Sequence, residues 1–259
     1  MRRIMLTVAY DGTDYHGWQY QDNTKTIEGE LNKGLTDLLK EPIEVIGASR
    51  TDAGVHALCN VAVFDTDAGI PAEKFSYALN QMLPSDIKVR ASKEVPLTFH
   101  PRKTDTVKTY EYRIDCEKFP NPIKQRFAYF TYTPLNEERM RQGAAYLIGE
   151  HDFKSFCSVN TTSLTTVRTI YDIQIERNDA DIAIQVTGNG FLYNMVRIIA
   201  GTLMEVGRGK YPPDRIGQML AQKDRTAAGP TAPACGLILK ELHFPQLESE
   251  ESKQPIESA

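Results

Sequence analysis

The feature that most constrains the fold is the order of apolar patterns in the first hundred residues. Ile4, Leu6, Val8 and Tyr10 alternate with polar residues, which indicates a half-buried strand. Apolar residues then recur at helical spacing until Pro42, which ends the helix. The full set of predicted segments is a strand over 4–10, a helix over 27–39, strands over 44–48 and 60–64, a helix over 75–82 and a strand over 87–93.

This β-α-β-β-α-β order is that of the split βαβ, or ferredoxin-like, arrangement. The later part of the chain repeats the order without repeating the residues. We therefore predict an α+β fold of two ferredoxin-like halves, 1–104 and 105–245, whose antiparallel sheets lie side by side with an active cleft between them. The later segments are strands over 109–116, 127–131, 167–176, 181–187 and 237–244, and helices around 140–148, 191–206 and 212–222.

Composition limits the class of protein. Of 259 residues, 41% are hydrophobic and 25% are charged, as in soluble globular domains. No apolar run approaches the roughly 18 residues that span a membrane. The four cysteines show no CxxC pair and the five histidines are scattered. We therefore expect reduced thiols, a cytoplasmic location and no bound metal.

The net charge of −4 does not suggest a general nucleic-acid binder. The final segment, 246–259, supplies three of these negative charges, and we predict that it is a disordered acidic tail. The remaining body is almost neutral. A nucleic-acid site would therefore need positive charge that is gathered locally in a cleft.

Asp52 lies in the segment Ser49-Arg50-Thr51-Asp52-Ala53-Gly54-Val55-His56, between two predicted strands. Asp and Gly are common turn residues, so a structural turn is one interpretation. Arg50 and His56 are larger and more polar than a turn requires. A second interpretation is that the connection presents Asp52 as a nucleophile at a strand end.

Arg197 interrupts an apolar helical run, and arginine is rarely buried without a partner. Its head group could reach water, form a structural ion pair or pair with a functional carboxylate across the cleft. In the last case the arginine would hold Asp52 ionised and lower its pKa by roughly 1–3 units. Tyr110, in Lys108-Thr109-Tyr110-Glu111-Tyr112, either packs in a sheet or stacks on a base.

Three aromatic residues lie in the segment Tyr10-Asp11-Gly12-Thr13-Asp14-Tyr15-His16-Gly17-Trp18-Gln19, which is dense in glycine and polar groups as well. It contains the one tryptophan of the chain. A structural hairpin and a loop that touches a polar ligand are both compatible with this composition.

Taken together, these residues resemble the tRNA pseudouridine synthase A family over about 4–244. The most specific match is the stretch from Arg50 to Ala57. Supporting matches follow in order: Tyr10-Asp11-Gly12, Gly17-Trp18-Gln19, Phe99-His100-Pro101-Arg102, Lys108-Thr109-Tyr110-Glu111-Tyr112, Gly149-Glu150-His151-Asp152-Phe153, Met195-Val196-Arg197, Gly201-Thr202-Leu203 and Gly236-Leu237.

The resemblance implies an isomerase that converts uridines 38 to 40 of the tRNA anticodon arm into pseudouridine. It implies a catalytic role for Asp52, for its paired Arg197, and for Tyr110, which stacks on the target uracil and helps to move its proton. It also implies that Arg50 helps to displace the nucleotide and that Leu237 walls the base pocket. We include His56 among the candidate substrate-binding residues because it is a large polar residue in the same motif.

The resemblance further implies a homodimer that uses neither metal nor organic cofactor. Isomerisation breaks the N1–C1′ bond and joins C5 to C1′ without redox change, so a nucleophile suffices. Whether Asp52 attacks C1′ or C6 stays open.

Two other functions stay open on the residues alone. A non-catalytic RNA-binding protein with two RRM-like halves would need an aromatic RNP-like strand that is not clear in the sequence. It would also give Asp52 and Arg197 no purpose. A hydrolase that uses Asp52 would normally need a second carboxylate, and we can nominate none.

Overall fold

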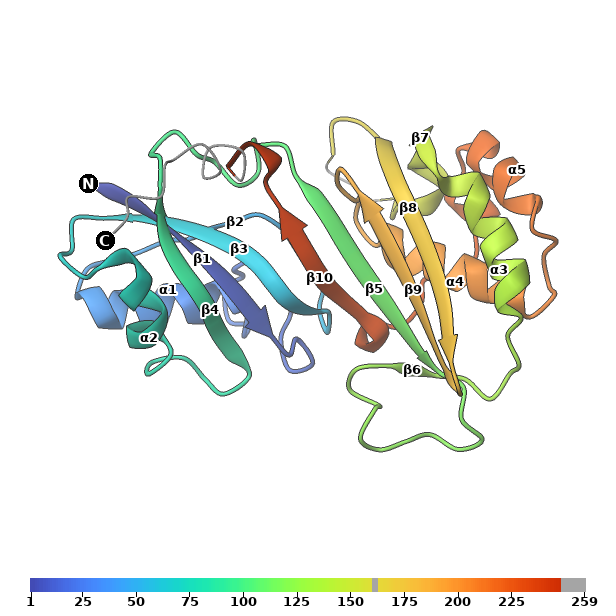
Figure 1. Ribbon diagram of the computed structural model, residues 1–259, viewed down its shortest axis with the longest axis horizontal. Helices are drawn as coiled ribbons and strands as arrows, with labels where there is room; N and C mark the ends of the chain where they lie inside the picture. Colours follow the sequence, from blue (N-terminus) through green and yellow to red (C-terminus); the bar gives the residue numbers. More distant parts are fainter. Residues whose placement is uncertain (160–162, 248–259) are drawn as a thin grey trace, which may run out of the picture.

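The computed structural model describes residues 1–159 and 163–247, and its strands form one ten-stranded sheet (Figure 1). The main path of the sheet is β4-β1-β3-β10-β5-β9-β8-β7, with β2 paired to β3 and β6 to β5. Almost all of the predicted acidic tail, 246–259, lies outside the described residues. Within the described residues, no helix is both long and apolar enough to cross a bilayer.

The first half follows the predicted order. Its elements are β1 (Arg2–Tyr10), α1 (Ile27–Leu39), β2 (Ile46–Gly47), β3 (His56–Thr66), α2 (Phe75–Leu79) and β4 (Ile87–Val95). β1 pairs antiparallel with both β3 and β4. The second strand is much shorter than the predicted 44–48, because only Ile46 and Gly47 pair with β3. β3 is longer than predicted and begins at His56, four residues after Asp52.

The second half also contains the predicted elements. They are β5 (Val107–Asp115), β6 (Tyr129–Phe130), α3 (Glu137–Ala144), β7 (Gly149–Asp152), β8 (Val167–Asn178), β9 (Asp181–Gly188), α4 (Met195–Gly207), α5 (Arg215–Gln222) and β10 (Leu237–His243). The sequence did not predict β7, since Gly-Glu-His-Asp has no apolar alternation. α4 begins at Met195 rather than Phe191, because Asn194 adopts a left-handed conformation with φ of 63°.

β10 joins the two halves into one sheet. It pairs antiparallel with β5, and at its start Ile238 and Leu239 pair parallel with His56 and Ala57 of β3. The last strand therefore lies at the centre of the molecule, and the two predicted sheets are continuous (Figure 1).

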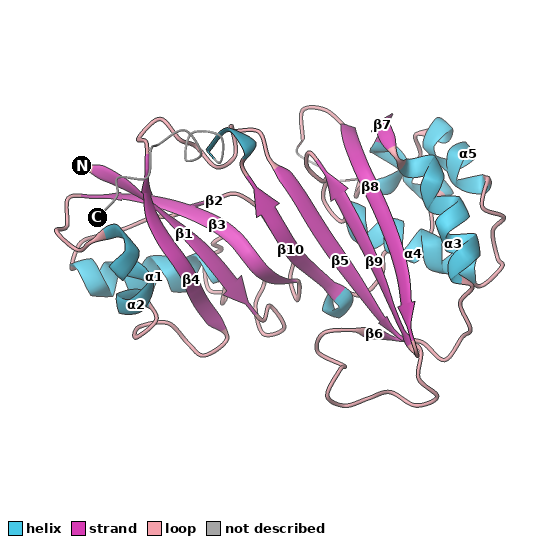
Figure 2. Cartoon of the chain, in the orientation of Figure 1, coloured by secondary structure: helices cyan, strands magenta, loops and turns pink. Residues whose placement is uncertain are grey.

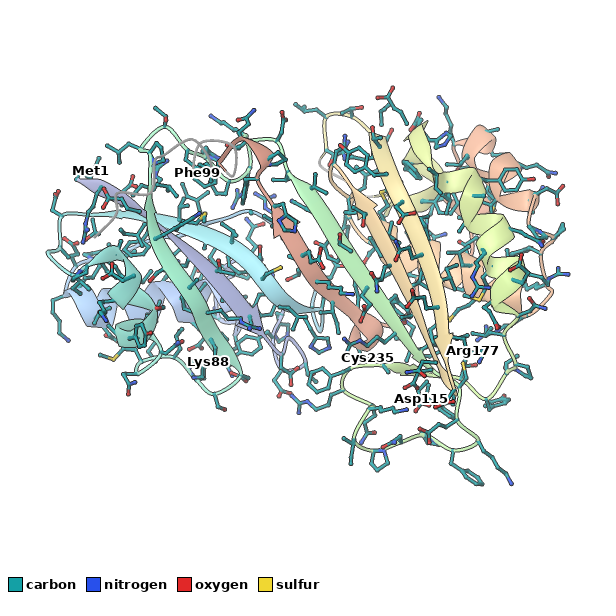
Figure 3. All side chains as sticks on the ribbon, viewed as in Figure 1. Met1, Lys88, Phe99, Asp115, Arg177 and Cys235 are labelled. Carbon is teal, nitrogen blue, oxygen red and sulfur yellow. The ribbon has the colours of Figure 1, made fainter. Side chains whose placement is uncertain are left out.

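The helices form two groups on one face of the sheet, α1 and α2 over the first half and α3, α4 and α5 over the second (Figure 2). One hydrophobic core runs beneath both groups and includes the alternate residues Tyr110, Tyr112 and Ile114 of β5. A small second cluster with Phe99 and Phe244 covers part of the opposite face. Charged side chains lie on that face at β5 and β10, where Glu111 pairs with Arg113 and Lys240. Side chains with nitrogen and oxygen ends stand over these strands in Figure 3.

Candidate active site

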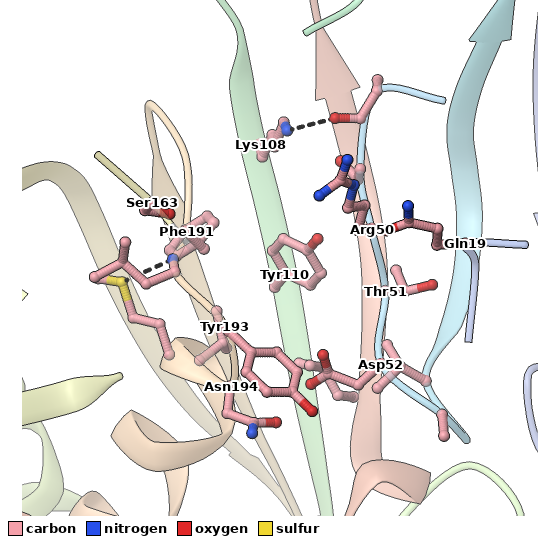
Figure 4. Close-up of a pocket in the computed structure, with 18 of the residues that line it drawn as sticks. Gln19, Arg50, Thr51, Asp52, Lys108, Tyr110, Ser163, Phe191, Tyr193 and Asn194 are labelled. Carbon is pink, nitrogen blue, oxygen red and sulfur yellow. Dashed lines mark hydrogen bonds between the residues drawn. The ribbon is translucent and has the colours of Figure 1, made fainter. Parts of the chain in front are cut away.

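A cavity of about 730 Å³ lies where the two halves meet, which is within the usual size range of small-molecule sites. The first half contributes the connection between β2 and β3, and the second half contributes β5 and the segment before α4 (Figure 4). Residues from both halves line the cavity, among them Gln19, Arg50, Asp52, Arg102, Lys108, Tyr110, Ser163, Phe191, Tyr193, Asn194 and Leu237.

The segment 10–19 holds the connection that carries Asp52 in place through backbone hydrogen bonds. The Trp18 amide donates to the carbonyl of Thr51 at 3.0 Å, and the Gly54 amide donates to the carbonyl of Tyr15 at 3.2 Å. Gly17 has φ of 90°, and a β-carbon there would lie 2.7 Å from the Thr51 oxygen. The dense segment 10–19 is therefore a support for the loop, and its His16 and Gln19 also line the cavity.

A buried polar network fixes the same loop to the sheet. Asn60, in the middle of β3, donates its side-chain amide to the Ser49 carbonyl at 2.9 Å and to the Tyr10 hydroxyl at 3.2 Å. The Tyr10 and Thr51 hydroxyls lie 2.8 Å apart. Because buried polar groups are costly unless paired, this network favours a single conformation for the residues before Asp52.

Arg197 comes from the first turn of α4 and reaches Asp52 across the cleft. Its Nη1 donates to Asp52 Oδ2 at 3.3 Å and to Asn194 Oδ1 at 2.9 Å, and its Nε donates to the Ala232 carbonyl at 2.8 Å. Both side chains of the ion pair are largely buried, with 17% and 14% exposure. Arg197 thus hydrogen-bonds to three different partners and does not form a bidentate pair with the carboxylate.

The net effect of this environment is to raise the pKa of Asp52. Burial raises the pKa, and the charge and hydrogen bond of Arg197 offset only part of the rise. The prediction of a lowered Asp52 pKa is therefore wrong: Arg197 does lower the pKa, but burial, which the prediction left out, raises it by more. A buried carboxylate with few other donors is poorly solvated, and poor solvation makes it a more reactive nucleophile.

Tyr110 extends from β5 toward the cavity and is 8% exposed. Its ring meets that of Phe191 edge-on, with centroids 5.2 Å apart. Burial raises the pKa of Tyr110, so the phenol is protonated at neutral pH. Tyr110 can therefore pack on a base and donate a hydrogen bond, but it is not ionised in advance to act as a base.

The other predicted residues lie in different places. Arg50 is exposed and Leu237 is buried, and both line the cavity. His56 does not line it: the ring is buried against Phe127, with centroids 5.0 Å apart, and its Nδ1 accepts from the Gly12 amide at 3.1 Å. The structure thus brings together every candidate except His56.

Sequence reasoning missed several cavity residues. Lys108 lies two residues before Tyr110 in sequence, and the structure places both on one face of β5. The Lys108 Nζ donates to the Ala48 carbonyl at 3.2 Å. Burial, and then the charge of Arg168, lower the pKa of Lys108 to about 8. Phe191, Tyr193 and Asn194 were assigned to a helix, although the preceding Gly188-Asn189-Gly190 signalled that the chain had not yet entered it.

Positive charge gathers at the cavity, as a nearly neutral nucleic-acid protein would require. Arg50, Arg102 and Lys108 line it together with the carboxylate of Asp52. Among the described residues, a group of acids that could hold a metal lies elsewhere, at Asp115, Glu117 and Asp181. There Lys124 donates to Glu117 and Asp181 at 2.8 Å, so the carboxylates already have a cation.

Such a site, with a carboxylate and an aromatic ring inside a basic cleft, is typical of enzymes that act on a base of a nucleic acid. A family model described as tRNA pseudouridine synthase matches residues 6–102 and 144–245. The chain therefore belongs to the tRNA pseudouridine synthase family.

Two relatives that resemble the chain in sequence agree with this assignment. A tRNA pseudouridine synthase A of Acetivibrio thermocellus is 47% identical over 94% of this chain and 100% of its own length. The enzyme of the same description in Thermoanaerobacter pseudethanolicus is 49% identical with the same coverage. A crystal structure of a Cbf5-Nop10-Gar1 complex aligns with 90% of this chain and 56% of the other at 13% identity, with a TM-score of 0.33.

Proposed function

We propose that this protein isomerises uridine to pseudouridine in tRNA, at uridines 38 to 40 of the anticodon arm, with Asp52 as the nucleophile. The observation that carries the proposal is the Asp52–Arg197 pair, which closes across the cleft at 3.3 Å beside Tyr110. Family membership and the tRNA pseudouridine synthase A relatives support the substrate class.

The chemistry assigns a separate task to each group. The ionised Asp52 attacks C1′ of the ribose or C6 of the uracil, which frees the N1–C1′ bond to break. The uracil turns in the cavity, C5 joins C1′, and the bond between Asp52 and the substrate breaks, which regenerates the carboxylate. N1, which has lost its bond to C1′, takes up a proton. The C5 proton then leaves to a base such as water, because Tyr110 is protonated. Arg197 holds the carboxylate in place throughout.

The target nucleotide must leave its stack before any of this occurs, which costs about a few kcal/mol. Packing of the uracil against Tyr110 offsets part of that cost, since stacking one base on an aromatic ring contributes on the order of 1–3 kcal/mol. Arg50, exposed at the cavity, is placed to contact the displaced nucleotide, and Leu237 forms an apolar wall.

We further propose that the protein acts as a homodimer, which light scattering in solution tests.

The proposal is tested with unmodified tRNA transcripts. We expect the wild-type protein to form pseudouridine at positions 38 to 40, mapped by chemical derivatisation and primer extension. Asp52→Asn should abolish this product while tRNA binding, measured by filter retention, stays within about threefold, because the variant keeps the shape of the loop.

The products of the same reaction distinguish the three candidate functions. Isomerisation leaves the RNA mass unchanged, a hydrolase releases free uracil, and an RNA-binding protein with two RRM-like halves does neither. Pseudouridine at the wild-type level with Asp52→Asn would contradict the proposed nucleophile.

A further inference from the structure

Asn194 lies in the cavity (Figure 4). Its side chain shares the Arg197 nitrogen that contacts Asp52. The Asn194 contact, at 2.9 Å, is the shorter of the two. We infer that Asn194 is a positioning residue that holds the Arg197 guanidinium against Asp52. This inference deepens the proposed function and rests on it for its meaning in catalysis.

The two ends of the Asn194 amide face different partners. Oδ1 accepts from Arg197, and Nδ2 donates to the Ser158 hydroxyl at 2.7 Å. Arginine has only donors, so the oxygen must be the end that faces it, and the orientation of the amide is fixed. Ser158 is itself attached to the same segment, since its amide donates to the Tyr193 carbonyl at 3.1 Å. The hydrogen bonds at both ends of the Asn194 amide therefore hold it in one orientation.

The backbone of Asn194 points to the same role. The residue precedes α4, where an asparagine normally accepts from the first helical amides. Here its side chain makes no such cap, and its backbone adopts φ of 63°. Asparagine tolerates this left-handed conformation better than most residues with a side chain. The side chain is thereby turned from the helix end toward Arg197.

The position of Arg197 matters because few groups act on the Asp52 carboxylate. Arg197, from α4, is the charged group that contacts it, and Tyr110, from β5, is a titratable group close enough for the Asp52 charge to act on its pKa. Burial pushes the pKa of Asp52 upward and Arg197 opposes that push. An arginine released from Asn194 would spend less time against the carboxylate, and the pKa of Asp52 would rise further.

Glycine at position 194 is the sharpest test, because it keeps the left-handed backbone and removes only the side chain. We expect Asn194→Gly to lower kcat about tenfold, to change KM for tRNA less than about threefold, and to move the acid limb of the kcat profile up by about half to one pH unit. Asn194→Asp should move it further in the same direction, because a second carboxylate competes for Arg197. The matched control is Asn23→Gly, at an exposed loop position with φ of 60°, where kcat and the acid limb should equal those of the wild type.

A second readout does not depend on catalysis. The carboxyl carbon of Asp52, followed by NMR through a pH titration of the free protein, should titrate at higher pH in Asn194→Gly than in the wild type. If the wild type makes no pseudouridine but this shift is present, the proposed function fails and the positioning role stands. If Asn194→Gly, with a wild-type melting temperature, leaves both the acid limb and the NMR titration unchanged, the inference is overturned.

Discussion

At the scale of single residues, the site depends on how one carboxylate is held in poor solvation. Among the residues that the structure describes, Asp52 has one charged contact, Arg197, and the contact is a single hydrogen bond of 3.3 Å. The Arg197 guanidinium is in turn held by Asn194 and by the Ala232 carbonyl. The geometry explains why an arginine is used here, since three partners in different directions need a planar group with several donors.

Arg197→Lys should therefore lower the rate of pseudouridine formation by on the order of 100-fold, as when one placed donor is lost from an active site. A lysine ammonium cannot meet both Asp52 and the Ala232 carbonyl with the same geometry. Single-turnover assays with tRNA measure the rate, and thermal denaturation should show a change of only a few degrees. Turnover near that of the wild type would remove Arg197 from the site.

The raised pKa of Asp52 also predicts a pH-dependent stability. A carboxyl whose folded pKa lies above its unfolded value favours folding when protonated, and this contribution is lost as pH rises through the folded pKa. Asp52→Asn mimics the protonated form, so it should melt at a higher temperature than the wild type near pH 7.5. Each kcal/mol corresponds to about 2–4 °C for a chain of this size.

Calorimetry between pH 3.5 and pH 8 checks this expectation, with the two proteins compared in the same buffers. The difference in melting temperature should shrink toward the acid end, where both side chains are neutral. A variant that is less stable than the wild type at pH 7.5, or a difference that is independent of pH, would contradict it.

The sequence identified Asp52, Arg197 and Tyr110 because unusual residues in regular patterns stand out: a carboxylate between strands, an arginine in an apolar helix and a tyrosine beside lysines. It did not give the direction of the Asp52 pKa. That direction depends on how much water the walls of the cavity exclude, and those walls come from segments far apart in the chain. The burial of His56 was hidden for the same reason, since Phe127 covers it from the other half.

At the scale of elements, Gly201 allows α4 to pack closely against a neighbouring segment. A β-carbon at Gly201 would lie 1.9 Å from the Pro230 carbonyl oxygen. The helix can therefore touch the segment 230–232 directly, and that segment carries the carbonyl that accepts from Arg197 Nε. Gly201 lies one turn after Arg197. The close packing of α4 on the segment 230–232 and the hydrogen bond that positions Arg197 therefore use the same face of the helix.

We expect Gly201→Ala to destabilise the protein by about 1–3 kcal/mol, because the segment must move to make room. The displaced Ala232 carbonyl should also reduce the rate of pseudouridine formation. Urea denaturation measures the first effect and tRNA modification the second. The matched control is Gly69→Ala, where an added β-carbon meets nothing within 4 Å and stability should hardly change.

Most elements could be predicted from periodicity, and the misses have local causes. β2 was predicted over 44–48 because the segment is apolar, but apolar character does not decide how many residues find a partner strand. α4 was started too early because Phe191 and Leu192 fit helical spacing, whereas the Asn194 backbone prevents the helix from extending back to them.

At the scale of the whole molecule, β10 joins the two halves into one sheet, because it pairs with a strand of each half. Leu239 is fully buried and pairs with Tyr110 on one side and Ala57 on the other. The strand thus connects the loop that holds Asp52 to the strand that holds Tyr110. The sequence predicted a strand here, but no periodicity reports which strands become its neighbours.

Leu239→Ala should cost about 2–5 kcal/mol, the usual range for a buried leucine. Trp18, the one tryptophan, is buried in the first half, so its fluorescence reports that half, while circular dichroism reports the whole chain. If the sheet is one cooperative unit, both signals should shift to lower urea together. Separate transitions, with the fluorescence midpoint unchanged, would show that 1–104 unfolds independently of 105–245.

The central place of β10 has a consequence for protein synthesis. The ribosome makes this strand after Asp52, Tyr110 and Arg197, yet the strand lies between the first of these residues and the second. A nascent chain that has all three groups but not β10 lacks the wall at Leu237 and the link between the halves. We therefore expect the proposed active site to form late, when β10 pairs with β3 and β5, and incomplete chains on the ribosome to leave the surrounding tRNAs unmodified.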